Sequence, residues 1–285
     1  ERGSWVNTIH AFVICAFGKS PYLENCIRSL LRQTAPSEIY IATSTPSEHI
    51  RRLARKYGLP LWVRQGESGI REDWLFAWRE GGNRKRLITI AHQDDCYCRD
   101  YAKTVLAMYE RYPDMTLFCS DYVTLKTRES RMADGTYYPV QTRICAGDLV
   151  RLVKKLLRLP LRFRFYANRT WVKKSALIFG NSICCPSCTY NYSLIGDHMF
   201  DSGYSFALDW ENLLSLAERP GRFVCVEEPL IAYRVHSGAA TKKCIEDHRR
   251  EADEASMFRK LWPDWMASLL MRFYKQSYKA YREDS

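Results

Sequence analysis

The chain has 285 residues, of which 46% are hydrophobic and 26% charged, a composition typical of a globular protein with a substantial core. It has no apolar run of about eighteen residues and no basic-then-apolar opening, which argues against a membrane-spanning helix and favours the cytoplasm. The net charge of +11 predicts an anionic partner, such as a polyanion, a membrane face or a phosphorylated substrate.

The first predicted element is a strand. Residues 11–17 form an unbroken apolar run, as expected for a central parallel strand that is buried on both faces. Gly18 ends the run, and Ser20 is placed to cap a helix with Pro21 at its first position. The apolar face of that helix is predicted to consist of Leu23, Cys26, Ile27, Leu30 and Leu31.

Strands and helices then alternate along the chain. We expect strands at 38–43, 61–63, 87–91 and 115–119, and helices at 46–58, 69–79 and 100–111. The 69–79 helix should turn Ile70, Trp74, Ala77 and Trp78 inward. This order predicts an α/β fold with a doubly wound, mostly parallel sheet flanked by helices. Ligands of such sheets bind beyond the carboxyl ends of the strands, the region that holds Phe17, Gly18, Ser44, Asp94 and Asp95.

The second half of the sequence is less regular. Residues 126–138 are polar and rich in turn formers, and 149–159 form a basic helical pattern. A strand is expected at 223–233, interrupted by Pro229, and a long helical stretch at 246–281 should break near Pro263.

The adjacent carboxylates of Asp94 and Asp95 are the first candidate for chemistry. Two such groups at the end of a buried strand repel each other, so their burial needs a compensating cation. Mg²⁺ or Mn²⁺ suits hard oxygen ligands and takes the rest of its shell from water and substrate phosphates. A solvated turn is the alternative interpretation of this pair.

The eleven cysteines are an odd number, and several lie in apolar runs, as Cys15, Cys119 and Cys225 do. This favours buried thiols in a reducing compartment over a disulfide framework. Zinc binding would need the Cys185–Cys188 and Cys96–Cys98 pairs to converge, and we do not expect it.

Four segments, in order, resemble motifs of family 2 glycosyltransferases, over roughly residues 8–240. The first resembles the first helix of that family, the second its DXD region, the third its acidic acceptor-side motif, and the fourth its late P-L-x-x-Y-R-x-H segment. They are Tyr22 to Thr34, His92 to Tyr97, Leu208 to Glu211, and Glu228 to Ser237.

The resemblance implies a GT-A fold with a helical C-terminal extension. Residues 5–122 would form the nucleotide-sugar-binding half, 123–240 the acceptor-binding half of the same domain, and 241–285 the extension. The implied reaction is inverting transfer of a sugar from a nucleotide diphosphate sugar, with a UDP-sugar as the expected donor, to a hydroxyl acceptor. Mn²⁺ or Mg²⁺ would assist, and the acceptor would be a glycan or a lipid-linked glycan in surface polysaccharide synthesis.

The resemblance also assigns roles on the donor side. Phe17, Gly18 and Arg71 would lie near the nucleotide, and Asp94 would contact the ribose. Asp95 would bind the metal. Two positions depart from the family pattern. Ser44 stands where the family often has an acidic residue, and His92 stands where many members have aspartate. We take His92 as structural by default.

On the acceptor side, the resemblance makes Asp209 the base that deprotonates the acceptor hydroxyl, with Glu211 as second candidate. An N-cap for the following helix is the structural alternative for Asp209. His236 would complete the metal shell or contact a phosphate. Arg234 could pair with the diphosphate or with a core carboxylate, and the sequence leaves both open.

Two other functions remain to be weighed. Sugar-1-phosphate nucleotidyltransfer would need a Gly-rich basic loop after the first strand, which residues 16–21 do not provide. A catalytically degenerate domain that binds polyanions or a membrane surface would be consistent with the departures at Ser44 and His92.

Basic stretches lie late in the chain. Residues 151–174 carry nine Lys or Arg and no acid, and 249–282 mix charge with aromatic residues. We expect the apolar faces of these helices to pack on the core. Their basic outer surfaces are candidates for peripheral contact with the inner face of a membrane. No binding motif supports a nucleic-acid partner.

Overall fold

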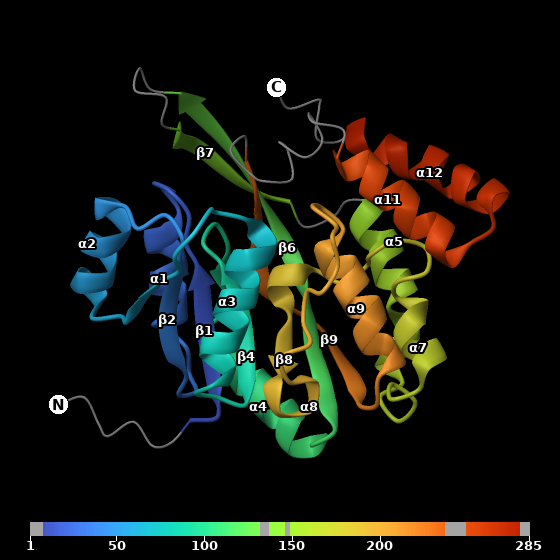
Figure 1. The fold of residues 1–285 in the computed structure, drawn as a ribbon, viewed down its shortest axis with the longest axis horizontal. Coiled ribbons are helices and arrows are strands. Elements are labelled where there is room, and N and C mark those ends of the chain that lie inside the picture. The colour runs from blue at the N-terminus through green and yellow to red at the C-terminus, as the bar shows by residue number, and fades with distance from the viewer. Residues whose placement is uncertain (1–7, 132–136, 146–148, 237–248, 280–285) are drawn as a thin grey trace.

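The computed structural model describes residues 8–131, 137–145, 149–236 and 249–279. A nine-stranded sheet runs through the molecule in the order β3-β2-β1-β4-β8-β6-β9-β5, with β7 paired to β6 (Figure 1). Its strands are β1 (His10–Cys15), β2 (Glu38–Thr43), β3 (Leu61–Val63), β4 (Leu87–His92), β5 (Cys96–Tyr97), β6 (Met115–Arg131), β7 (Tyr137–Cys145), β8 (Thr189–Asn191) and β9 (Arg222–Val235).

The first four strands are parallel, and β1 and β4 are buried on both faces. Phe12 and Ile14 of β1 join one hydrophobic cluster, whereas Ala11 and Val13 join the other. The alternation explains why the sequence of β1 is apolar without a break. The helices that connect these strands are α1 (Leu23–Leu30), α2 (Glu48–Tyr57), α3 (Ile70–Gly82) and α4 (Tyr101–Arg111).

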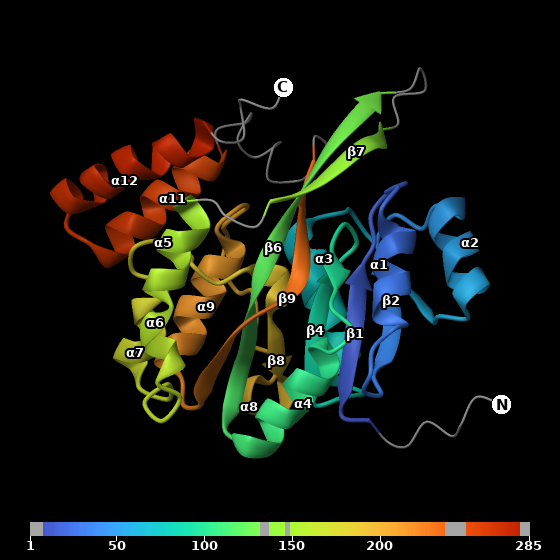
Figure 2. The same ribbon diagram turned by 180° about the vertical axis from the view of Figure 1, so that it is seen from behind.

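The second part of the sheet is mixed. β6 and β9 are parallel to each other, and the short β8 lies antiparallel between β4 and β6. Helices gather beside this part of the sheet (Figures 1 and 2). They are α5 (Leu149–Leu157), α6 (Leu159–Arg162), α7 (Thr170–Ser175), α8 (Tyr192–Ile195), α9 (Leu208–Glu218), α11 (Arg249–Leu261) and α12 (Asp264–Lys279).

The mostly parallel α/β architecture expected from the sequence is confirmed. The α2 helix ends at Gly58 with φ +62°, and the last helical stretch breaks at Pro263. Parts of the predictions at 126–138, 246–281 and the 241–285 extension lie outside the described residues, as does Ser237.

Four local predictions were wrong. Leu31 is the C-cap of α1 and is 47% exposed, so it does not belong to the buried face of that helix. Residues 126–131 continue β6, which pairs with β7, so this segment is a hairpin arm in place of a turn-rich loop. Ile70 is 40% exposed because it begins α3, one turn before the buried face. Ser20 does not cap α1, whose N-cap is Tyr22, because the Ser20 hydroxyl donates to Asp94 instead.

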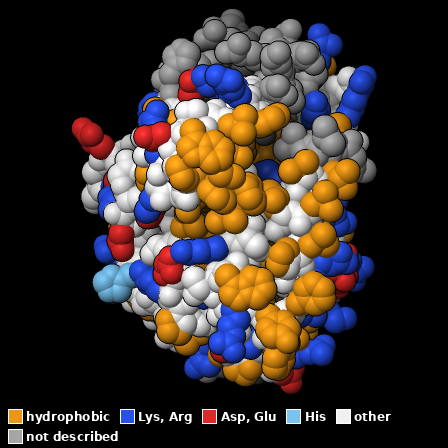
Figure 3. Space-filling model, turned by 90° about the vertical axis from the view of Figure 1, so that its right-hand side faces the viewer, with side chains coloured by type: hydrophobic (Ala, Val, Ile, Leu, Met, Phe, Trp, Pro, Cys, Tyr) orange, Lys and Arg blue, Asp and Glu red, His pale blue; other side chains and the backbone are white. Residues whose placement is uncertain are grey.

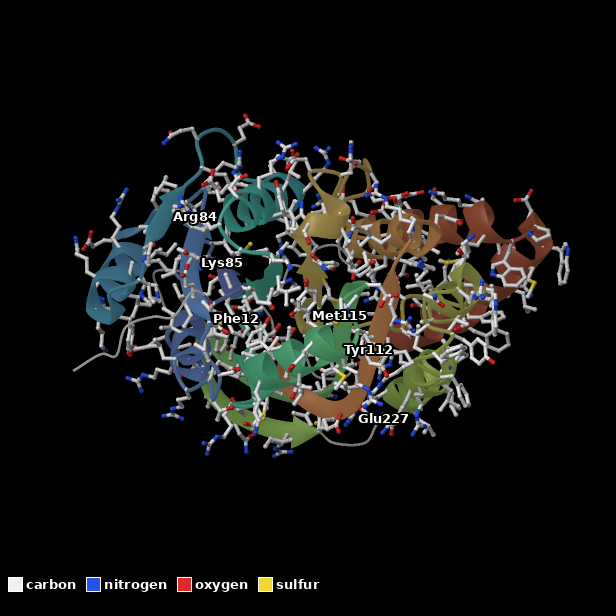
Figure 4. The ribbon with its side chains drawn as sticks, turned by 90° about the horizontal axis from the view of Figure 1, so that it is seen from below. Phe12, Arg84, Lys85, Tyr112, Met115 and Glu227 are labelled. Carbon is white, nitrogen blue, oxygen red and sulfur yellow. The ribbon has the colours of Figure 1, made fainter. Side chains whose placement is uncertain are left out.

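Side-chain contacts join the amino ends of the parallel strands to one another. Figure 4 views this side, with Phe12 of β1 in the interior and Lys85 just ahead of β4. Lys85 Nζ lies 2.6 Å from Glu38 Oε1, which ties the start of β4 to the start of β2. The His10 ring contacts Ser37 Oγ and Thr89 Oγ1, and burial lowers its pKa to about 3, so it is neutral. This leaves the opposite, carboxyl edge for a ligand.

A carboxylate of α11 holds the chain that enters α9. Asp253 Oδ2 accepts the backbone N–H groups of Ser205, Phe206 and Ala207, at 2.9, 2.6 and 3.2 Å. Three consecutive N–H groups therefore share one charged acceptor, and the start of α9 depends on the C-terminal helices.

We expect Asp253→Ala to lower the free energy of unfolding by about 2 kcal/mol, because it removes charge-assisted hydrogen bonds to partly buried donors. Urea denaturation followed by far-UV circular dichroism measures this. Glu110→Ala removes an exposed carboxylate from α4 and should cost less than about 0.5 kcal/mol. Equal losses in both variants would contradict the anchoring role of Asp253.

Candidate active site

The loops that follow β1, β2 and β4 are tied together at the carboxyl edge of the sheet. Phe17 N–H donates to Gln93 Oε1 at 2.9 Å, and Gln93 Nε2 donates back to the Phe17 carbonyl at 3.2 Å. Gly18 N–H donates to Thr45 Oγ1 at 2.9 Å, with Gly18 at φ +61°. The structure thus brings Phe17, Gly18 and the Asp94 loop to one edge, and the Phe17 ring is left 53% exposed.

The end of β2 carries no acid, but α3 supplies one. Asp73 lies beside Ser44, whose hydroxyl donates to Asp73 Oδ2 at 2.8 Å. Arg64 Nε donates to Asp73 Oδ1 at 2.7 Å and fixes the carboxylate. Sequence reasoning missed Asp73, because nothing in the first turn of α3 signals that it reaches back to β2.

Asp94 faces outward from the sheet, toward His236 at the end of β9. Ser20 Oγ donates to Asp94 Oδ1 at 2.6 Å, and His236 Nε2 lies 3.4 Å from Asp94 Oδ2. On its other side His236 Nδ1 lies 3.2 Å from Glu129 Oε1. Burial lowers the pKa of His236, but the two carboxylates outweigh it and raise the pKa to about 9. His236 is therefore a cation between two acids at neutral pH.

Glu129 completes this cluster from β6. Its side chain is fully buried, and Tyr22 Oη donates to its Oε1 at 2.6 Å. Sequence reasoning missed Glu129, because the polar composition of 126–138 predicts turns. Only the length of β6, which carries Glu129 up to β9, places the carboxylate there.

Asp95 points the opposite way, into the core. Its side chain is 2% exposed, and Oδ1 accepts the backbone N–H of Arg234 at 2.7 Å. Burial raises the pKa of Asp95 to about 8. The Arg234 side chain donates to the Asp94 carbonyl at 2.9 Å and lies over the Tyr22 ring. Arg234 thus contacts both aspartates: its backbone N–H donates to the Asp95 carboxylate, and its guanidinium donates to the Asp94 carbonyl.

His92 is packed as an aromatic ring. It stacks on Trp74 with ring centroids 5.1 Å apart, and burial lowers its pKa to about 4. Its Nδ1 lies 4.0 Å from Asp95 Oδ2. Arg71, at the start of α3, donates from Nε to the carbonyl of Phe200 at 2.9 Å, so its guanidinium bridges to the second half of the chain.

Asp209 lies in the first turn of α9 and is not its N-cap, which is Ala207. Asn181 Nδ2 donates to Asp209 Oδ2, and Trp210 N–H donates to Oδ1, both at 2.8 Å. Burial raises the pKa of Asp209 to about 6, although these hydrogen bonds and the charge of Lys154 oppose the rise. Glu211 pairs instead with Lys260 of α11 at 2.9 Å.

The Cys184 thiol, at the start of the Cys184–Cys188 turn, lies close enough to Asp95 and Asp209 to be affected by both charges. Burial raises the pKa of Cys184 to about 12, and both carboxylates add to this rise. The described cysteines are all free thiols. Within the described residues, no group of three His, Cys, Asp or Glu side chains is arranged to hold a metal ion.

Comparison with known proteins gives a match of fold. No family model matches the sequence, and no curated protein resembles it. Among solved structures, residues 1–349 of TarS from S. aureus superpose with a TM-score of 0.55 at 12% identity, covering 93% of this chain and 69% of that one. A second TarS structure, in complex with UDP-GlcNAc, has a TM-score of 0.53 at 11% identity and covers 93% and 70%.

Glucosyl-3-phosphoglycerate synthase from Mycobacterium tuberculosis, in complex with Mn²⁺, UDP and glucosyl-3-phosphoglycerate, has a TM-score of 0.52 at 11% identity, over 88% of this chain and 79% of that one. Both proteins are GT-A-type glycosyltransferases. The chain described here has the GT-A fold, as its sequence motifs led us to expect.

Proposed function

We propose that this protein is an inverting glycosyltransferase that moves a sugar from a UDP-sugar to a hydroxyl acceptor, in surface polysaccharide or glycan synthesis. The observation that carries the proposal is the contact of Asp94 with His236 at the carboxyl edge of a GT-A sheet. Asp209, whose pKa burial raises to about 6, is the base in this proposal, and its charge and that of Asp95 both affect the Cys184 thiol. The solved structures of similar fold that contain UDP or UDP-GlcNAc support the choice of donor.

The donor would lie along the edge formed by Phe17, Gly18 and Ser44. The exposed Phe17 ring offers a face for the base, and Gly18 allows the backbone to approach closely. Asp73 replaces the acid that is missing at Ser44, because its carboxylate lies 2.8 Å from the Ser44 hydroxyl. Arg71 at the entrance of α3 would be drawn from the Phe200 carbonyl toward the phosphates.

The donor set at Asp94 fits Mn²⁺ or Mg²⁺. Two neighbouring ligands of an octahedral ion lie about 3 Å apart, and Asp94 Oδ2 and His236 Nε2 are 3.4 Å apart. Because the two carboxylates raise the pKa of His236 to about 9, a bound ion would displace the proton on Nε2. Oxygen and imidazole ligands suit Mn²⁺. We therefore assign the cation to Asp94 and His236, and not to Asp95 as the sequence motif suggested. When bound, such an ion would neutralise charge that develops on the diphosphate.

The chain's own residues would perform the remaining steps. Asp209 accepts the proton of the acceptor hydroxyl, whose oxygen then forms a bond to the anomeric carbon of the sugar. The bond from that carbon to the diphosphate oxygen breaks on the opposite face, and its electron pair leaves with UDP. A single displacement of this kind inverts the anomeric configuration. Asn181 holds the Asp209 carboxylate through Oδ2 and so fixes its direction.

A second candidate is a degenerate domain that binds polyanions without catalysis. The observation in its favour is the raised pKa of His236, which lies between Asp94 and Glu129 and satisfies both carboxylates without a metal. This candidate predicts that UDP binding neither requires a divalent cation nor changes with one.

Calorimetry distinguishes the two candidates. We expect UDP to bind with Mn²⁺ and to release no measurable heat with chelator. Asp94→Ala should abolish the metal-dependent binding, whereas Glu110→Ala should leave it unchanged. Metal-independent binding in the unaltered protein would refute the transferase proposal.

The two aspartates should differ in what their loss affects. Asp95→Asn should retain both the fold and Mn²⁺-dependent UDP binding, because its amide oxygen can still accept the Arg234 N–H. A thermal melt and a UDP titration of each variant test this. If Asp95→Asn folds fully but no longer binds Mn²⁺, Asp95 is a metal ligand and the assignment to Asp94 and His236 is wrong.

The pH dependence of transfer should report Asp209. A base with a pKa of about 6 is ionised at neutral pH and becomes protonated on acidification, so kcat/KM should fall about tenfold per pH unit below that value. Asp209→Asn should lower kcat by about 10²- to 10⁴-fold and leave UDP affinity unchanged. Wild-type transfer rates in Asp209→Asn would exclude it as the base.

A further inference from the structure

The outward face of α12 is apolar and has no packing partner within the described residues. Trp265, Leu269 and Phe273 recur every fourth residue and are 70%, 44% and 64% exposed. The inward face of the same helix, with Ala267 and Met271, is buried in the core. The inward face accounts for the stability of the helix, so the outward residues require a different explanation.

A second exposed aromatic group lies on the same side of the molecule, between α6 and the start of α7. Phe163, Phe165, Tyr166 and Trp171 belong to it, with exposures from 51% to 79%. Figure 3 looks onto this side and shows a large hydrophobic patch in its upper half, with separate aromatic rings below. Lys and Arg side chains surround both. We call these four residues, together with the three of α12, the aromatic face.

Cationic side chains border the aromatic face. A groove of about 240 Å³ between α11 and α12 has Ala255, Ala267 and Met271 on its apolar side. Arg259, Arg272 and Lys275 line it as well, and Lys275 pairs with Glu251. Among the described residues, neither Arg259 nor Arg272 lies within ion-pairing distance of a carboxylate. An apolar surface bordered by guanidinium groups is complementary to anionic lipid, which offers acyl chains below a layer of phosphates.

A second copy of the chain fits this face less well. Two copies would each bring a net charge of +11, and the same arginines would face each other across a two-fold axis. An aqueous surface is also unfavourable, because tryptophan and phenylalanine prefer the interface between water and lipid. No helix in the described part of the chain has the length and apolar character needed to cross a bilayer.

We propose that the aromatic face docks this protein onto an anionic lipid bilayer, with α12 lying in the plane of the interface. Trp265 and Phe273 enter the headgroup region, and Arg259 and Arg272 contact lipid phosphates. The proposal is independent of the transferase function, since none of these residues belongs to the edge that holds Asp94 and His236.

Vesicle flotation tests the docking. Full-length protein is mixed with vesicles of phosphatidylcholine alone, or of phosphatidylcholine with roughly one third phosphatidylglycerol. We expect flotation with the anionic vesicles and little with the neutral ones. The double variant Trp265→Ala/Phe273→Ala should lower the partition coefficient by at least about tenfold. Arg259→Ala/Arg272→Ala should lower it by about fivefold per charge, and added salt should weaken wild-type binding.

Matched controls separate the face from general charge and from misfolding. Arg51→Ala/Arg52→Ala removes two exposed arginines from α2, at the other end of the sheet, and should float like wild type. Leu31→Ala removes an exposed apolar side chain beside α1 with the same expectation. Mn²⁺-dependent UDP binding, measured on every variant, should be unchanged, so that loss of docking and failure of the transferase proposal remain distinct.

Three results would overturn the proposal: no flotation of wild type with anionic vesicles, equal flotation of the aromatic double variant, or equal loss in the α2 control. Light scattering without lipid tests the competing occupant. A wild-type dimer that becomes monomeric in Trp265→Ala/Phe273→Ala would assign the face to a second copy of the chain instead.

Discussion

The site depends on the compensation of two adjacent carboxylates at the end of β4. Asp94 and Asp95 would repel each other in a partly buried position, and the end of β9 relieves this on both sides. Arg234 donates its backbone N–H to Asp95 and its guanidinium to the Asp94 carbonyl, while His236 faces Asp94. Arg234 and His236, two residues apart at the end of β9, therefore hold the two aspartates that follow β4. Asp95 is buried, whereas the side chain of Asp94 is partly exposed at the carboxyl edge of the sheet.

This arrangement requires strands that are distant in sequence to end at the same edge. β4 and β9 are separated in the sheet by β8 and β6, yet β5, which follows the aspartates, pairs with β9 itself. Cys96 lies opposite Ala232, so the two residues after the carboxylate pair are registered against the residues before Arg234. The pairing of the short β5 with β9 thus holds Asp94 and Asp95 close to Arg234 and His236.

The sequence predicted the first half of the fold well, because apolar runs such as 11–17 and caps such as Gly58 are local signals. It also identified Asp94, Asp95, Asp209 and His236 as residues of interest, through motifs. It could not find Glu129 or Asp73, because each acts on a residue far away in the chain. The sequence also could not show which way each of the two aspartate side chains faces. That direction depends on the backbone N–H of Arg234, which is 139 residues away from Asp95.

The C-terminal helices connect the acceptor side to the aromatic face. Asp253 holds the entry to α9, Lys260 pairs with Glu211 two residues after Asp209, and Trp262 Nε1 donates to the Ile178 carbonyl at 2.7 Å. Ile178 lies three residues before Asn181, which holds the Asp209 carboxylate. These contacts tie α11 and the start of α12 to the segments that position Asp209. If the aromatic face lies on lipid, the base is held in a fixed orientation to that surface, as an acceptor anchored in the same surface would require.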